Sequence, residues 1–157
     1  MAMIFEKASK KDISALCDLR IAYLIEDFGT ISSENLKILQ KTLPKYYKKH
    51  LNKDLFIFLT KRDAEIVACA FLLLVEKPAS PSFITGKTGT VLNVYTKPKY
   101  RKNGYAKKLL TMLLKEAKEK NVSVIELKST EAGYPLYKAL GFEEIVEKYH
   151  NMKIVLR

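Results

Sequence analysis

The most informative part of the chain reads Asn93-Val94-Tyr95-Thr96-Lys97-Pro98-Lys99-Tyr100-Arg101-Lys102-Asn103-Gly104-Tyr105-Ala106. Its first residues are typical of a β-strand, which Pro98 ends because proline has no N–H to donate to a ladder. Basic residues and Gly104 then lead into a helix. Free N–H groups at a helix start attract phosphate, and a residue without Cβ lets the backbone approach it closely. The segment therefore predicts a pyrophosphate-binding turn.

The charges around this turn support the same interpretation. Arg101, Lys102 and Lys107 add fixed positive charge, and an arginine can direct two donors onto one phosphate. Taken alone, Gly104 would more often be an ordinary loop residue. Its basic neighbours and the helix that follows it favour the phosphate role.

Downstream of the turn, an apolar stripe with lysines on the opposite side predicts the strongest helix in the chain, from Gly104 to Ala117. Val122–Leu127 is expected to form a strand, and Glu131–Leu140 a short helix that Gly141 closes. Phe142–Arg157 is expected to resume extended structure.

Upstream, the pattern alternates in the same way. We expect a strand at Ile4 and Phe5, then a helix through Leu24 that Ser9 or Asp12 caps. An amphipathic segment should follow from Ser32 to Tyr47, with a kink or interruption at Pro44. After it we expect a hairpin of Leu55–Thr60 with Ile66–Val75, a loop at Pro78–Gly86 and a strand at Thr90–Thr96. This order predicts an α/β fold with parallel middle strands, in one domain over residues 1–157.

Composition limits the partners. The 157 residues carry a formal charge of +11, from 28 Lys and Arg against 17 Asp and Glu, which favours nucleic acid, acidic lipid or a phosphorylated cofactor. Two cysteines, Cys17 and Cys69, make neither a disulfide framework nor a zinc site, so no metal is expected. The longest apolar run, Ile66–Val75, is about half the length needed to span a bilayer. With no leader pattern at Met1–Ser9, we expect a cytoplasmic protein without a membrane partner.

Two motifs together resemble those of a known family. Arg101-x-x-Gly104-x-Ala106 after a strand is similar to the acyl-CoA signature of the GNAT superfamily of N-acetyltransferases. One strand later, Leu127–Phe142 resembles the second hallmark of that family, a Leu-Tyr followed by Gly-Phe. Ile4–Leu24, with Asp12 and Leu19-Arg20, is similar to the first strand and helix of the family, so the likeness covers nearly the whole chain.

The resemblance implies a fold and a co-substrate. It implies a mixed, twisted central sheet, classed as α/β or in some schemes α+β, flanked by about four helices and open between the strands Val91–Thr96 and Val122–Leu127. Acetyl-CoA would lie in that opening, its pantetheine arm paired with the strand edge. The implied cofactor-binding residues are Val94, Tyr95, Thr96, Arg101, Lys102, Asn103, Gly104, Tyr105, Ala106, Lys107 and Thr130. Lys102 stands where glycine is frequent in the family, and Thr130 where asparagine is.

Amine acetylation needs a neutral nucleophile, a stabilised oxyanion and a proton for the leaving thiolate. N–H groups near Val94 are candidates for the oxyanion. The resemblance implies Tyr137 as general acid, since a phenol with a pKa of about 10 stays protonated beside a thiol near 8.5, although a lone tyrosine there would more often be a core aromatic. For the base we keep open Glu126, a relay water held by Asn93, and solvent.

The function so predicted is an acetyl-CoA-dependent N-acetyltransferase, an acyltransferase in which a primary amine of a small molecule, protein or peptide attacks the thioester directly. Two alternatives stay open: a catalytically silent acyl-CoA-binding sensor, and a basic nucleic-acid-binding module whose nine Tyr and seven Phe stack on bases. No nucleic-acid motif accompanies the charge, so no nucleic-acid partner is expected. The sequence does not identify the amine acceptor, and it leaves open whether the chain forms a homodimer.

Overall fold

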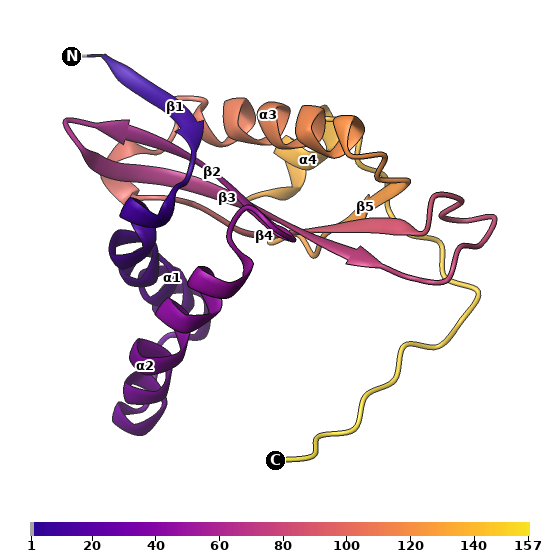
Figure 1. Ribbon diagram of the computed structural model, residues 1–157, viewed down its shortest axis with the longest axis horizontal. Helices are drawn as coiled ribbons and strands as arrows, with labels where there is room; N and C mark the ends of the chain where they lie inside the picture. The colour runs from indigo at the N-terminus through magenta and orange to yellow at the C-terminus, as the bar shows by residue number, and fades with distance from the viewer. Residues whose placement is uncertain (1) are drawn as a thin grey trace.

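The computed structural model describes residues 2–157 and contains one five-stranded sheet in the order β1-β2-β3-β4-β5 (Figure 1). The strands are β1 (Met3–Lys7), β2 (Leu55–Arg62), β3 (Glu65–Glu76), β4 (Lys87–Thr96) and β5 (Val124–Glu126). The first four pair antiparallel in sequence order, and β4 pairs with β5 in parallel. The expected mixed sheet and the hairpin of β2 with β3 are therefore confirmed.

Four α-helices cover the two faces of this sheet (Figure 1). Helices α1 (Ile13–Phe28) and α2 (Ser33–His50) lie on one face, and α3 (Tyr105–Glu119) and α4 (Tyr134–Ala139) on the other. Short 3-10 turns precede α1 at Lys10–Asp12 and α3 at Pro98–Tyr100. Pro44 lies inside α2 without ending it. In the described part of the chain, no helix is both long enough and apolar enough to cross a membrane.

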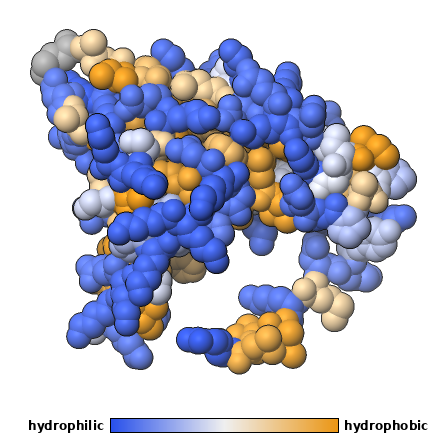
Figure 2. Space-filling view, viewed as in Figure 1, coloured by the Kyte–Doolittle hydropathy of each residue, from blue (hydrophilic) through white to orange (hydrophobic). Residues whose placement is uncertain are grey.

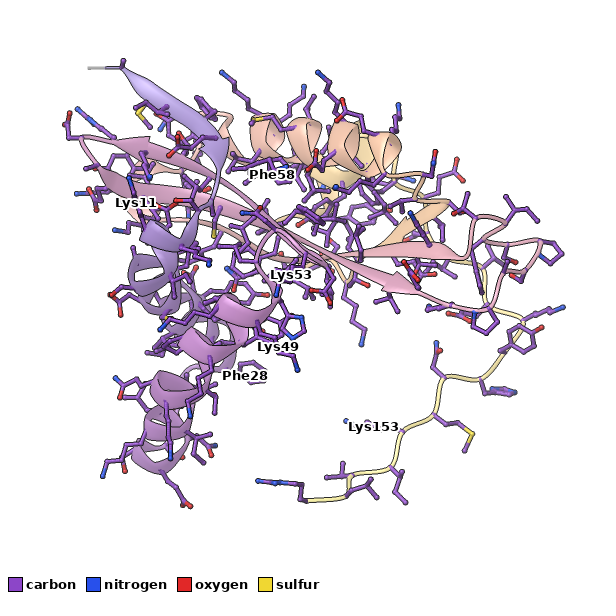
Figure 3. All side chains as sticks on the ribbon, in the orientation of Figure 1. Lys11, Phe28, Lys49, Lys53, Phe58 and Lys153 are labelled. Carbon is purple, nitrogen blue, oxygen red and sulfur yellow. The ribbon has the colours of Figure 1, made fainter. Side chains whose placement is uncertain are left out.

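The sequence of β2 is apolar throughout rather than alternating because both faces of the strand are buried. Leu55, Ile57 and Leu59 face a core shared with α1 and α2, while Phe56 and Phe58 face a second core shared with α3. Figure 3 shows Phe58 between the sheet and α3. Because helices cover both faces, every residue from Leu55 to Thr60 is buried.

The edges of β4 and β5 separate soon after they meet. Their pairing covers only Thr88–Thr90 of β4 against Val124–Glu126 of β5, so β5 is shorter than expected and Val91–Thr96 has no neighbour on that side. On the other side, two residues of β4, Asn93 and Val94, stand opposite one residue of β3. This β-bulge, with φ of 50° at Asn93, bends β4 away from β5. The expected opening between the two strands is confirmed.

The C-terminal segment, residues 142–157, departs from expectation. It contains no strand, so the last strand of the expected strand-helix order is absent from it. It leaves the body of the molecule and runs as an extended trace below the sheet, ending far from β5 (Figure 1). Its large apolar residues are exposed; they are Ile145, Val146, Tyr149, Met152, Ile154, Val155 and Leu156. Figure 2 shows hydrophobic atoms near the end of this segment, apart from the body of the molecule.

Candidate active site

The turn between β4 and α3 has the geometry of an anion site. Gly104 is the N-cap of α3 in the left-handed conformation (φ 77°, ψ 9°), and Lys102 before it also has a positive φ. The side chain of Asn103 donates to the carbonyl of Tyr100 at 2.9 Å and holds the turn. The first hydrogen bond of the helix runs from Lys108 N to the Gly104 carbonyl, so the preceding N–H groups have no partner within the helix.

A cavity of about 540 Å³ opens in front of this turn. All eleven residues predicted to bind the cofactor line it, including Gly104, the Val94–Thr96 edge and Thr130. A Cβ built on Gly104 would meet no atom within 4 Å, so the space beside that backbone is open. The geometry fits a phosphate group held against the helix start. The binding role of each residue stays a prediction.

Arg101 is engaged differently from expectation. Its Nη2 donates to Glu26 Oε2 at 2.8 Å, its Nε donates to the Thr96 carbonyl at 2.8 Å, and its guanidinium lies 5.5 Å from the centre of the Tyr95 ring. The hydrogen bond from Arg101 lowers the pKa of the Glu26 carboxyl. The arginine therefore ties the turn before α3 to α1, while Lys102 and Lys107 are exposed cations on the same cavity.

A second cavity, of about 1150 Å³, lies on the other side of the opening between β4 and β5. It contains the three residues predicted to be catalytic, Asn93, Glu126 and Tyr137. Five residues line both cavities: Tyr23, Asp27, Val94, Thr130 and Tyr137. The two cavities therefore meet at the bulge of β4 and at α4.

Tyr137 lies at this junction and is half-buried. Burial, with a smaller contribution from Tyr23, raises the pKa of Tyr137 to about 12. Its ring packs edge-on against Phe142, with centroids 5.8 Å apart. A Cβ on Gly133 would lie 2.9 Å from Cε2 of that ring, so only glycine leaves room for it. The phenol is neutral near pH 7 and can donate a proton.

The other two predicted catalytic residues, Asn93 and Glu126, differ in burial and in hydrogen bonding. The Asn93 side chain is 3 % exposed, accepts from Arg20 Nη1 at 3.0 Å and donates to Cys69 Sγ at 3.5 Å. Its amide thus has protein partners on both sides, which favours a positioning role over holding a water. Glu126 ends β5, is exposed, and faces the second cavity.

Sequence reasoning did not find the contribution of α1 to the site. Tyr23, Glu26 and Asp27 line the first cavity from that helix, and Arg20 and Tyr23 line the second. Their spacing of three and four residues places them on one helix face. That spacing was the available signal, but the sequence does not say which side of α1 faces β4.

Comparisons with known proteins agree with this geometry. A family model described as the acetyltransferase (GNAT) family matches residues 16–142. The chain is similar to the crystal structure of a predicted acetyltransferase with acetyl-CoA from Clostridium acetobutylicum, with 33% identity, a TM-score of 0.84, and coverage of 97% of this chain and 96% of that one. No match was found among proteins with curated descriptions.

Two more distant structures share the fold. They are a GCN5-related N-acetyltransferase from Ralstonia eutropha, with 22% identity, a TM-score of 0.78 and coverage of 96% and 99%, and the ribosomal-protein-alanine N-acetyltransferase from Brucella melitensis, with 18% identity, a TM-score of 0.66 and coverage of 97% and 100%. In each pair the first coverage refers to this chain.

The chain belongs to the GNAT acetyltransferase family. Membership supports acyl transfer in general. Among residues 2–157, no group of three or more His, Cys, Asp or Glu side chains could hold a metal ion.

Proposed function

We propose that this chain transfers an acetyl group from acetyl-CoA to a primary amine of a small molecule or peptide. The observation that carries the proposal is the meeting of two cavities at Val94 and Tyr137, one with a phosphate-binding turn and one open to an acceptor. A transferase needs such a junction because its two substrates must touch at the reacting atoms. Glutamate, asparagine and tyrosine side chains around the junction supply polar groups for the chemistry.

The residues divide the work as follows. The N–H groups at the start of α3 would hold the diphosphate, and the unpaired edge of Val94–Thr96 would bind the pantetheine arm as an added strand. The extra residue of the bulge leaves backbone N–H groups without ladder partners, and near Val94 these could donate to the thioester oxygen.

In the transfer step the amine nitrogen attacks the thioester carbonyl carbon. A C–N bond forms, the C–S bond breaks, and the sulfur leaves with the electron pair. Tyr137 gives its proton to the sulfur as the C–S bond breaks; its pKa of about 12 keeps the phenol protonated near pH 7. Before the attack, the acceptor ammonium gives one proton to Glu126, to Asp27 or to solvent, because only the neutral amine has a lone pair. Both carboxylates line the second cavity. The proton that the nitrogen loses as the amide forms restores the Tyr137 phenol.

Titration calorimetry with acetyl-CoA, followed by a free-CoA assay across polyamines, amino acids, aminoglycosides and peptides, tests the proposal. We expect binding heat and acceptor-dependent CoA release. Heat without release from any acceptor would favour the acyl-CoA sensor. A thermal shift with short DNA and none with acetyl-CoA would favour the nucleic-acid module and overturn the proposal.

We also propose that the chain forms a homodimer through its C-terminal segment. Residues 142–157 expose seven large apolar side chains, and β5 has a neighbour on one edge only. A free strand edge and an unpaired apolar segment in the same chain are complementary surfaces, and the segment runs away from its own β5 (Figure 1). The occupant that fits both is the segment of a second copy. Light scattering at micromolar concentration should give twice the chain mass, and a monomer would contradict the proposal.

A further inference from the structure

Arg20 is a half-buried cation without an acidic partner among residues 2–157. The ion pairs of the described chain involve Lys7, His50, Lys61, Lys97 and Arg101, and none includes Arg20. A half-buried guanidinium keeps only part of its hydration, and an anion bound in the cavity that it lines would complete its hydrogen bonds. The counter-ion of Arg20 is therefore expected from outside the chain.

The position of Arg20 is fixed by two contacts. Its Nη1 donates to Asn93 Oδ1 at 3.0 Å, and its guanidinium carbon lies 5.8 Å from the centre of the Tyr23 ring. These contacts use one of five N–H donors, and no other donor of this guanidinium has a partner among the described residues. The rest of the fork is free to bind a planar anion through two parallel hydrogen bonds.

The free side of Arg20 belongs to the acceptor cavity. Arg20 lines the 1150 Å³ cavity together with Asn93, Val94 and Tyr137, and it does not line the cofactor cavity. Because Asn93 binds Arg20 and precedes Val94 in the bulge, the guanidinium lies close to the place where acyl transfer is proposed. If the acceptor carries an anionic group that binds there, that group must be only a few bonds away from the attacking nitrogen of the same molecule.

From this geometry we infer that the acceptor is a primary amine carrying a carboxylate within a few bonds of the nitrogen, and that Arg20 binds the carboxylate. Free amino acids are the simplest members of this class. The inference rests on the proposed function and narrows its acceptor. Glu126 and Asp27, which line the same cavity, would then face the ammonium end.

Matched acceptor pairs test the inference. Alanine and phenylalanine are compared with alaninamide and phenylalaninamide, which keep the shape and lose the charge. The amide has the more acidic ammonium group, so preference for the carboxylate would run against amine reactivity. We expect kcat/KM to favour the carboxylate by about 10- to 100-fold, the range of a charge-assisted hydrogen bond. Arg20→Gln should abolish this preference by raising KM for the carboxylates, and Arg20→Lys should retain part of it.

Arg62→Gln is the matched control, because Arg62 also lies over a tyrosine ring, at 5.9 Å from Tyr100, but is exposed and lines neither cavity. It should keep the preference. An equal loss of kcat for both members of each pair in Arg20→Gln, with KM unchanged, would mean that Arg20 only positions Asn93, and would overturn the inference. A wild type that prefers the amides would also overturn the inference. The same holds if no carboxylate of the panel is acetylated, or if none raises the Tm of the CoA-loaded protein.

The two levels of the proposal fail differently. If the protein binds acetyl-CoA and acetylates uncharged amines without preference, the acceptor class is wrong and the transferase function stands. If calorimetry with acetyl-CoA gives no heat, the transferase function itself is wrong. The thermal midpoint of each variant shows whether a loss comes from unfolding.

Discussion

Tyr137 is the residue on which the proposed chemistry depends most directly. It lines both cavities, its ring is fixed by Phe142, and Gly133 leaves space for it. These contacts involve the ring, whereas no hydrogen bond occupies the phenol oxygen among the described residues. A hydroxyl kept free at the junction is available for proton transfer.

Replacing Tyr137 by Phe therefore separates chemistry from binding. The ring contacts remain, so the heat of acetyl-CoA binding should not change, while loss of the proton donor should lower kcat by about 10²- to 10⁴-fold. Steady-state CoA release and calorimetry measure the two effects. Tyr134→Phe is the control, because Tyr134 lies on the same helix, donates to Glu144 and lines neither cavity. Unchanged kcat in Tyr137→Phe would remove the tyrosine from the mechanism.

Gly104 tests the phosphate turn. Alanine there should cost about 1–2 kcal/mol of stability, because a side chain in the left-handed region is strained. It should also place a methyl group in the open space before the helix start and weaken acetyl-CoA binding at least tenfold. Calorimetry gives the affinity and urea unfolding the stability.

Gly141→Ala provides the control for that strain. Gly141 also has a positive φ, of 96°, and an open Cβ position, but it lines neither cavity. Its alanine variant should lose similar stability and bind acetyl-CoA like the wild type. Equal affinity in both glycine variants would show that the turn at Gly104 does not hold the phosphates.

At the scale of elements, one charged cluster joins the N-terminal strand to the sheet. Lys61 Nζ on β2 contacts Glu6 of β1 at 2.7 Å and Asp12 of the 3-10 turn at 2.8 Å. The Ser9 amide donates to the same Asp12 carboxylate at 2.8 Å. Burial alone would raise the pKa of Asp12, but hydrogen bonds from Lys61 and Ser9 outweigh it and lower that pKa.

The pH dependence of stability follows from this direction. A carboxyl whose pKa is lowered in the folded state stabilises the fold above its unfolded pKa, about 3.9, and this contribution is lost as pH falls through the folded value. Asp12→Asn should be less stable than the wild type at pH 7, with a smaller further loss of Tm below pH 4. Thermal melts from pH 7 to pH 2 measure this. The exposed Asp63→Asn is the control, and parallel Tm curves for Asp12→Asn and wild type would contradict the prediction.

Helix α3 and the phosphate turn could be predicted from sequence because their signals are local. The apolar stripe fixes the helix, and Pro98 and Gly104 fix where the chain turns. The two motifs lie about 30 residues apart. Only the family resemblance predicted that they line the same cavity. The eleven residues predicted to bind the cofactor line one cavity, and most of them are consecutive along the chain.

Features that depend on register or packing could not be predicted. The bulge at Asn93 comes from a shift between β3 and β4, and nothing in the β4 pattern marks it. The hydrogen bond of Arg101 with Glu26 was not predicted, because Glu26 lies 75 residues earlier in the chain. The limits of β5 were overestimated because Val122 and Leu127 pack in the core without regular backbone pairing. Helix α4 was expected to begin at Glu131 but begins at Tyr134, after a turn.

At the scale of the whole molecule, the site exists only because the sheet opens. The proposed cofactor cavity lies beside α3 and α4, and the proposed acceptor cavity is lined by residues of α1 and of the C-terminal segment. Ile145 and Met152 of that segment line the acceptor cavity, so its placement and the proposed dimer affect the same site. Figure 3 shows Lys153 on this segment apart from the helices of the N-terminal half.

The C-terminal segment allows the monomer and the dimer to be told apart by substitution. Val146 is 96 % exposed and Leu156 is 85 % exposed. If the segment stays in water, the double variant Val146→Lys and Leu156→Lys should change stability by no more than about 0.5 kcal/mol and leave the mass unchanged, as surface changes do. If a second copy covers the segment, both lysines become buried charges and the dimer should dissociate.

We expect dissociation, measured by light scattering as a halving of mass, together with a lower Tm. Ile84→Lys, in the loop between β3 and β4, is the matched control because that side chain is 74 % exposed and lies outside the segment. Its mass should stay that of the dimer. A wild type with the mass of one chain would contradict the dimer, and a double variant that keeps the dimer mass would show that the segment is not its interface. We expect the dimer because exposed apolar patches of this kind normally mark an interface.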